Sequence, residues 1–257
     1  MKYPRANMKF VLCLLAMLVV KVGYAQETIE VVSAEGSVVA EDALEKTSTQ
    51  VHSRNVVPNG NVLSTGPDGR AVVRVGSEGY VVLGKNSKLE INRGNTEKPG
   101  FFKQLTGVIY YAINSIKGNK RSVEIRTATS TIGIRGTRFL VNDSEERKEI
   151  GMRKGVVSVT SIDGDFEIHK KSEQDEFEAF KQEGKAAIAQ SDKEFKDYKA
   201  KTQQEFIEFK REFSLAANRM ASFDGNRVVD RPLGGETKKD MESFEGYAEE
   251  WLDKVRD

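Results

Sequence analysis

Two arginines flank a glycine in the stretch T-I-G-I-R-G-T-R-F-L-V, residues 131–141, and they are the first candidates for chemistry. The guanidinium groups of Arg135 and Arg138 present planar sets of N–H donors that suit carboxylates and phosphates. The stretch lacks the lysine and the following helix of a phosphate-binding loop, so it does not indicate nucleotide binding. The two arginines therefore either pair with carboxylates or carbonyl groups of the protein itself or contact a ligand.

The histidines and serines of the chain do not form a catalytic or metal-binding pattern. His52 and His169 stand alone, without the H-x-H or H-E-x-x-H spacing of a metal site. Ser53, Ser64 and Ser87 lie in predicted turns, and none is part of the G-x-S-x-G sequence that exposes a nucleophilic serine.

Four carboxylates are scattered after the arginine motif, at Asp143, Glu145, Glu146 and Glu149. These residues fall in a predicted exposed turn, whereas glycoside hydrolysis requires two carboxylates that converge on one bond. We therefore expect no catalytic residues, no metal site and no cofactor, and we predict that the protein is not an enzyme.

The N-terminus has the pattern of a secretory signal peptide. Lys2, Arg5 and Lys9 precede an apolar run at residues 10–20, and the small residues of G-Y-A, which ends at Ala25, suit signal peptidase. The run is shorter than the roughly 20 apolar residues that span a bilayer. We therefore expect residues 1–25 to be removed, no transmembrane span to remain, and the protein to be exported to the periplasm or cell envelope, or secreted.

Cysteine content and charge exclude further classes of protein. The single cysteine, Cys13, lies in the leader, so the mature chain would have neither disulfides nor thiolate metal sites. Loss of the four basic residues of the leader changes 40 basic and 39 acidic residues to 36 and 39, a net charge of −3. A nucleic-acid-binding protein usually carries a large basic excess, so we exclude nucleic acid as a partner.

Residues 26–169 have the composition of an all-β domain. They are rich in Val, Ile, Thr and Gly, and turn sequences such as P-N-G and P-D-G separate short alternating runs. Strands are predicted at residues 28–32, 37–40, 62–65, 71–75, 80–83, 88–91, 107–113, 123–128, 131–141, 149–153 and 156–161. So many short strands indicate an antiparallel sandwich, a roll or a solenoid-like coil.

The strand predicted at residues 131–141 contains a break in its alternation. If the pattern of Ile134 continued without interruption, Arg138 would lie on the buried face. A β-bulge at Gly136 would shift the register by one residue, so that Phe139 joins Ile134 and Arg138 faces the other side. This glycine is therefore interpreted as a structural device.

Residues 170–222 have the pattern of a long amphipathic helix. The runs E-F-E-A-F-K, E-F-K-D-Y-K and E-F-I-E-F-K place aromatic residues on one stripe with a period near 3.6. Such a helix would be roughly 75 Å long, whereas the β domain would be roughly 30 to 40 Å across, so part of the stripe would need another surface. We predict that the stripe mediates self-association or partner binding, through Phe195, Tyr198, Phe206, Phe209 and Phe213.

The C-terminal part of the chain is predicted to contain a linker and a second, short helix. D-G-N and P-L-G-G mark residues 223–236 as the linker. The helix is predicted at residues 237–257, where it could fold back onto the long helix as a hairpin. Its apolar face would consist of Met241, Phe244, Ala248, Trp251, Leu252 and Val255.

Several motifs of the β region occur in the order of a known family. They are G-x-V at 36–38, P-N-G-N-V-L-S-T-G-P-D-G-R-A-V-V at 58–73, L-G-K-N-S-K-L-E-I at 83–91, L-T-G-V-I at 105–109 and V-E-I-R-T-A-T-S-T-I-G-I-R-G-T-R-F-L-V at 123–141. Together they resemble the FecR domain. The ending G-x-R-G-T-x-F is the most specific, and its residues are assigned a structural role: Gly133, Arg135, Gly136, Thr137 and Phe139.

The resemblance implies an extracytoplasmic β module without a known catalytic centre, as found in iron-citrate-type signal regulators and in many exported proteins. The membrane-spanning regulators carry a sigma-factor-binding segment before their span and a receptor-docking domain after the β module, whereas here a leader and an aromatic helix are predicted. We therefore expect a noncatalytic binding or scaffolding module of the bacterial cell envelope. Its partner would be an envelope protein, a cell-wall component or a second copy. The alternatives are a sensor or regulator of a FecR-type signalling system and an accessory protein that acts on wall or glycan.

Overall fold

The structure is a computed structural model of the 257-residue chain, and it describes residues 29–42, 45–77, 79–92, 100–114, 123–170 and 207–254. The predicted signal peptide, residues 1–25, lies outside these ranges. Within them the protein is mainly β, as predicted, with one helix at the C-terminus. None of the described helical residues forms a segment long and apolar enough to cross a membrane.

The strands form two layers that share one long strand, β8 (Phe101–Ile113). Neighbouring strands are antiparallel except in the pairs β8–β9 and β14–β18, and the sheet does not close. Sheet A consists, in spatial order, of β1 (Ile29–Glu35), β5 (Arg70–Val75), β6 (Gly79–Leu83), β8, β11 (Thr137–Asp143), β12 (Lys148–Lys154), β17 (Arg219–Asp224), β18 (Arg227–Pro232), β14 (Phe166–Lys170) and β15 (Ile207–Lys210). Sheet B consists of β3 (Ser48–Gln50), β2 (Val38–Glu41), β4 (Val62–Thr65), β7 (Lys88–Asn92), β8, β9 (Glu124–Arg126), β10 (Ser130–Ile134), β13 (Val156–Ser161) and β16 (Glu212–Ala216).

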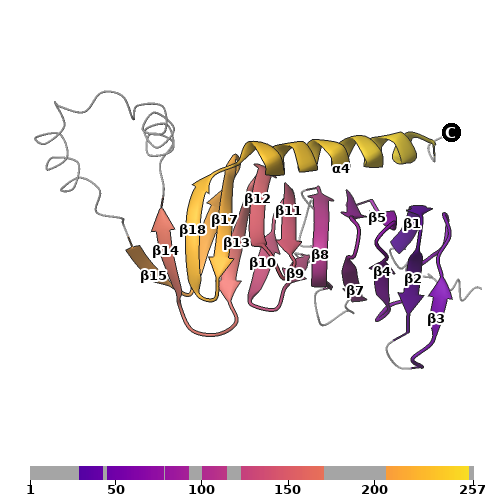
Figure 1. Cartoon of the computed structure of the whole chain (residues 1–257), viewed down its shortest axis with the longest axis horizontal. Coiled ribbons are helices and arrows are strands. Elements are labelled where there is room, and N and C mark those ends of the chain that lie inside the picture. The colour runs from indigo at the N-terminus through magenta and orange to yellow at the C-terminus, as the bar shows by residue number, and fades with distance from the viewer. Residues whose placement is uncertain are drawn as a thin grey trace, which may run out of the picture.

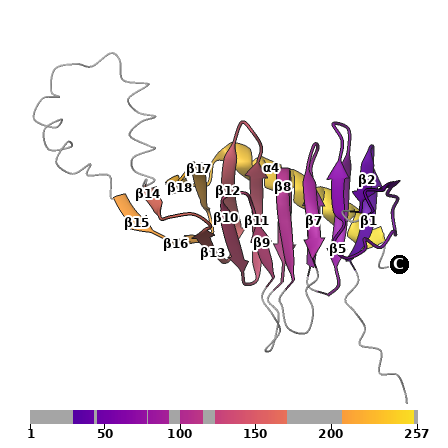
Figure 2. The same cartoon turned by 90° about the horizontal axis from the view of Figure 1, so that it is seen from below.

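The chain crosses repeatedly from one sheet to the other, so that strands consecutive in the sequence often lie in different layers. The strand β8 makes this crossing without interruption: its first half pairs with β7 in sheet B and its second half pairs with β6 in sheet A. The bend falls at Gly107, where φ is +91° and the backbone lies against Ser87. Figures 1 and 2 show the resulting row of strands along the long axis of the molecule.

The arginine motif forms another of these crossings, and the prediction of a β-bulge at Gly136 is wrong. The predicted single strand is two strands, β10 in sheet B and β11 in sheet A, joined by Arg135 and Gly136. Gly136 has a φ of +69°, which allows the chain to turn. The expected outcome for the side chains is nevertheless seen, because Ile134 and Phe139 are both buried between the sheets while Arg138 is exposed. A shift of register occurs two residues later than expected, between Arg138 and Phe139.

The main core lies between the two sheets. It consists of alternate residues of each strand, which face inward because successive side chains of a strand point to opposite sides. At its centre Tyr111 stacks on Phe139 with ring centroids 5.1 Å apart. Towards β14 and β16, Phe166 packs edge-on against Phe213 at 5.4 Å, and Phe223 completes the aromatic group.

The helix α4 (Gly235–Lys254) lies across the outer face of sheet A, as Figure 1 shows. The predicted C-terminal helix therefore exists, but it packs on the sheet rather than in a hairpin with another helix. Its buried residues Met241, Phe244 and Ala248 form a second core, together with Tyr247, which the prediction omitted. The sheet contributes apolar residues from five strands to this core: Val32, Val72, Val82, Tyr110, Ala112 and Leu140.

The predicted long helix and the linker are wrong wherever the structure describes them. Residues 207–210 and 212–216 form β15 and β16, and residues 219–224 and 227–232 form β17 and β18. The rest of the predicted helix, residues 171–206 with Phe195, Tyr198 and Phe206, lies outside the described residues. The D-G-N sequence is the turn of the β17–β18 hairpin, with Gly225 at a φ of +59°. The β sandwich thus continues past the boundary predicted at residue 169.

Candidate functional site

Arg138 of the arginine motif faces α4 and takes part in a group of charges beneath the helix. Glu245 of α4 accepts a hydrogen bond from the hydroxyl of Tyr110, and its carboxylate lies 3.1 Å from Nε of Arg153 and 3.8 Å from Nη1 of Arg138. The Glu245 side chain is only 12% exposed. We call Glu245 with Tyr110, Arg138 and Arg153 the helix clamp. It attaches the C-terminal helix to the strand that carries the motif.

The five residues assigned to the family motif have structural positions. Gly133 lies on the outer side of β10, where a Cβ atom would be 3.8 Å from its nearest neighbour. Arg135 is exposed at the crossing beside Gly136, and Thr137 and Phe139 are buried. The motif therefore forms the crossing between the sheets and, through Arg138, the contact with the helix.

Three tyrosines at the contact between α4 and sheet A have raised pKa values. Burial raises the pKa of Tyr80 and raises that of Tyr110 far above its usual value, while for Tyr110 the hydrogen bond to Glu245 adds to the effect. Burial also raises the pKa of Tyr247 to about 12. The Tyr247 hydroxyl forms a buried hydrogen bond of 3.0 Å with Ser33, and Arg70 stacks on its ring at 4.0 Å.

We predict that the free energy of unfolding falls as the pH rises above about 10, the pKa of an unfolded tyrosine. The unfolded chain then loses protons that the folded chain retains until the pH passes the raised values. Tyr247→Phe should lower the free energy of unfolding at pH 7, because it loses the hydrogen bond to Ser33. Between pH 7 and pH 11, however, the free energy of unfolding of this variant should fall by less than that of the wild type. Urea unfolding followed by the fluorescence of Trp251 measures both; equal decreases would contradict the prediction.

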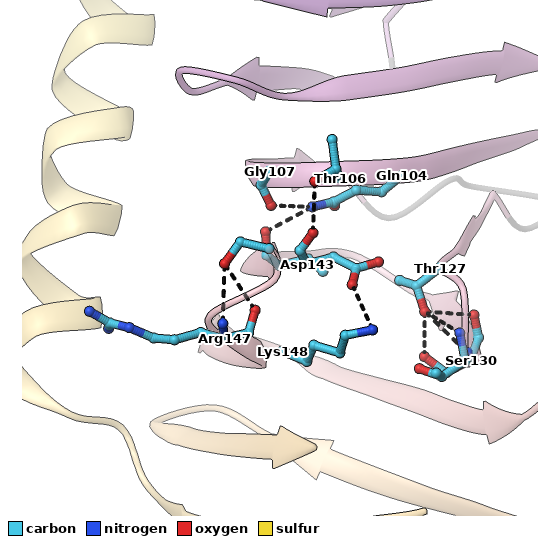
Figure 3. A network of polar contacts seen from close by, with 11 residues as sticks. Gln104, Thr106, Gly107, Thr127, Ser130, Asp143, Arg147 and Lys148 are labelled. Carbon is cyan, nitrogen blue, oxygen red and sulfur yellow. Dashed lines mark hydrogen bonds and ion pairs between the residues drawn. The ribbon is translucent and has the colours of Figure 1, made fainter. Parts of the chain in front are cut away.

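A polar network fixes the bend of β8 to the end of β11 (Figure 3). The buried amide of Gln104 donates to the carbonyl oxygens of Gly107 at 2.8 Å and Val141 at 3.1 Å, and its oxygen accepts from Tyr111 at 3.0 Å. Asp143 lies next to this group, 3.8 Å from Lys148, and burial raises the pKa of its carboxyl. The amide thus satisfies one carbonyl group at the bend of β8 and one on β11, and the role of the network is structural.

The remaining candidates for acid–base or metal chemistry lie apart. Glu149 accepts a hydrogen bond from Ser222 at 3.1 Å, and His169 lies 2.7 Å from Glu167, while His52 is in an exposed loop. In the part of the chain that the structure describes, no three His, Cys, Asp or Glu side chains converge as a metal site.

The end of the sandwich formed by β14, β15 and β16 contains a pocket of about 400 Å³. Ile168 and Phe213 contribute apolar surface, and charged residues surround them. Glu208 bridges the two lysines of the rim, at 3.0 Å from Lys170 and 2.6 Å from Lys210. The complete lining consists of Ile168, Lys170, Glu208, Lys210, Glu212, Phe213, Ser214 and Asp230. We call this the end pocket.

Two of the predicted interface aromatics are described, and they have different environments. Phe209 lies on the outer side of β15 and is 68% exposed, with Ile207 beside it at 44%. Phe213 is only 8% exposed and belongs to the core, so the prediction that it lies on an exposed helical stripe is wrong. The difference arises because the chain crosses from sheet A to sheet B between β15 and β16, so the odd-numbered side chains face outward in β15 and inward in β16. The sequence pattern did not reveal this, because the same phenylalanines also fit a helical period.

Strand edges border the end pocket on two sides. Among the described residues β15 pairs only with β14, and β16 pairs only with β13. Each is thus the last described strand of its sheet, and its second edge carries backbone groups that can accept another strand. A second recess, of about 340 Å³, lies at the opposite end beside β3 and is lined mainly by polar residues such as Thr49, Gln50 and Asn55.

Comparisons with known proteins identify the central part of the chain. The family model FecR, described as "FecR protein", matches residues 61–158, which run from β4 into β13. Two crystal structures of a candidate anti-sigma factor from Parabacteroides distasonis ATCC 8503, at 2.50 Å and 1.65 Å resolution, are similar at 11% identity and a TM-score of 0.44. The similarity covers 69% of this chain and 62% of each of those chains, which is less than two thirds of their length. No curated protein matches the sequence. Residues 61–158 are therefore a FecR domain, as the resemblance of the G-x-R-G-T-x-F motif predicted.

Proposed function

We propose that this protein is a noncatalytic recognition module of the bacterial cell envelope, which binds an exported or membrane-bound protein partner at the end pocket. The observation that carries the proposal is the pocket itself: apolar surface from Ile168 and Phe213 lies within a charged rim, between two strand edges. An extended peptide of the partner would bind the edge of β16 through backbone hydrogen bonds and place alternate side chains in the adjoining pocket. The signal-peptide pattern supports an extracytoplasmic location.

The end pocket is built by residues outside the FecR match. Its lining comes from β14, β15, β16 and β18, whereas the match ends at residue 158. The FecR domain would thus supply a rigid sandwich, and the following strands would supply the specificity for a partner. This division of roles agrees with a family whose β module occurs in proteins with different flanking segments.

Ser214 offers a direct test because it lines the pocket and its side chain is exposed. A photo-crosslinking residue at position 214 of the full chain, produced in cells, should form an adduct with a protein that can be identified by mass spectrometry. Ser214→Arg should then weaken binding of that purified protein at least tenfold by filling the pocket. Thr49→Arg, in the recess at the other end, is the matched control and should leave binding unchanged. Equal binding by both variants would contradict the proposal.

A regulator of a FecR-type signalling system is the second candidate function, and the FecR match favours it. In this role the partner at the end pocket would be a membrane protein that controls a sigma factor. Deletion of the gene should change transcription from the promoters of that sigma factor, and the wild-type chain should restore it whereas the Ser214→Arg chain should not. If transcription is unchanged while the partner still binds, the recognition function stands without the regulatory one.

A further inference from the structure

The second edge of β15 has a sequence that is complementary to itself. The strand reads I-E-F-K, so Phe209 lies between an acidic and a basic residue. Glu208 and Lys210 point toward the end pocket, and Phe209 points to the outer side together with Ile207. We propose that a second copy of this chain docks here, by antiparallel pairing of β15 with β15 about a two-fold axis at Phe209.

Charge selects this register. With Phe209 opposite Phe209 of the second copy, Glu208 faces Lys210 and Lys210 faces Glu208, so both charged pairs are attractive. Opposite charges that face each other across an antiparallel pair stabilise it, and like charges destabilise it. If the two-fold axis passed through residue 208 or residue 210 instead, two Glu208 or two Lys210 side chains would lie opposite each other. Among registers that keep the outer side chains together, the arrangement centred on Phe209 is thus the favourable one.

The same register accounts for the exposed apolar side chains. A two-fold axis perpendicular to the sheet keeps the outer side chains of both copies on one surface. The two Phe209 rings, each 68% exposed in the single chain, would then contact each other. Ile207 would lie against the aliphatic part of Arg211 of the second copy, because these positions are opposite in this register.

Lysine on a short edge strand usually prevents pairing between sheets. Lys210 does not prevent pairing with a second copy of this chain, because the second copy places Glu208 opposite each Lys210. The edge of β15 therefore discriminates between this chain and other proteins with exposed strands, whereas the edge of β16 remains available to the proposed partner. In the pair, sheet A would continue from one copy to the other, and the two end pockets would lie on the same side of the joined sheet. The pairing itself needs no bound partner protein, so it can be tested separately from the proposed recognition function.

Single and combined charge changes test the register. Sedimentation equilibrium of the full mature chain at low salt should show a dimer, and Glu208→Lys or Lys210→Glu alone should weaken its association at least tenfold, because each places like charges opposite each other. A mixture of these two variants should form a heterodimer, since every opposed pair is again attractive. Lys254→Glu makes the same charge change as Lys210→Glu, but at the end of α4, and should leave the dimer unchanged.

Several outcomes would overturn the inference. A wild-type chain that is monomeric at about 100 µM, far above the dissociation constants of stable homodimers, would do so. So would a dimer that tolerates both single changes and Phe209→Ser, because its interface would then lie elsewhere. Failure of the mixture to associate, with circular dichroism showing both variants folded, would reject the proposed register. Since none of these measurements involves the end-pocket partner, they leave the recognition function untouched.

Discussion

Gly107→Ala is expected to lower the free energy of unfolding by about 2 to 4 kcal/mol. A Cβ atom at this position would lie 2.3 Å from Oγ and 2.5 Å from Cα of Ser87, and the φ of +91° is unfavourable for any residue with a side chain. Movement of the backbone at Gly107 to relieve this contact would disturb the hydrogen bond that the Gln104 amide donates to the Gly107 carbonyl. Urea unfolding with circular dichroism measures the effect.

Gly133→Ala is the matched control for this prediction. Gly133 belongs to the most specific family motif, but a Cβ atom there would make only ordinary contact, at 3.8 Å from Ser158. The change should stay within about 0.5 kcal/mol of the wild type, or stabilise slightly by restricting the unfolded chain. If Gly133→Ala were the more damaging substitution, the motif glycine would have a role that backbone geometry does not explain.

Glu245→Ala is expected to destabilise the fold by about 2 to 4 kcal/mol, because it removes the acceptor of the helix clamp. The hydroxyl of Tyr110 would lose its partner beneath α4, and the Arg138 and Arg153 guanidinium groups would face each other without the intervening carboxylate. Trp251 is the only tryptophan of the chain and packs at the edge of the helix–sheet core. Its fluorescence therefore reports whether α4 remains docked.

Glu250→Ala provides the comparison on the same helix. Glu250 is exposed and pairs with Lys254 one turn away at 2.9 Å, so its loss should cost no more than about 0.5 kcal/mol. Both variants remove one carboxylate from α4, so overall charge and helix propensity change alike. Equal stability of the two would show that the clamp contributes nothing beyond a surface ion pair.

The strands of the FecR domain could be predicted because their alternation is regular and their turns carry strong signals. The predictions at residues 62–65 and 156–161 agree exactly with β4 and β13. The first half of β8 was missed, since the prediction began at Gly107 and treated that glycine as a strand start rather than a bend within a strand. The short β3 and the strand β14 were missed as well.

The segment from residue 207 shows where the pattern of residues is not sufficient. Phe209 and Phe213 are four residues apart, which suits a helix, while Ile207 with Phe209 and Phe213 with Leu215 also alternate as in strands. Neither period is decisive over so few residues. The strand state prevails because β14 and β13 present backbone hydrogen-bonding partners to this segment, and those partners are distant in sequence.

The sequence by itself determined the β class of the central domain, its FecR motif and the apolar face of the C-terminal helix, since each depends on residues close together in the chain. Only the tertiary structure decided that Arg135 and Gly136 form a crossing between sheets, that α4 covers sheet A through Glu245, and that β14, β15 and β16 enclose a pocket. These features depend on which strand edges and faces meet. Which edges and faces come together is determined by packing and hydrogen bonding between residues far apart in the chain, and a local sequence pattern does not encode these contacts.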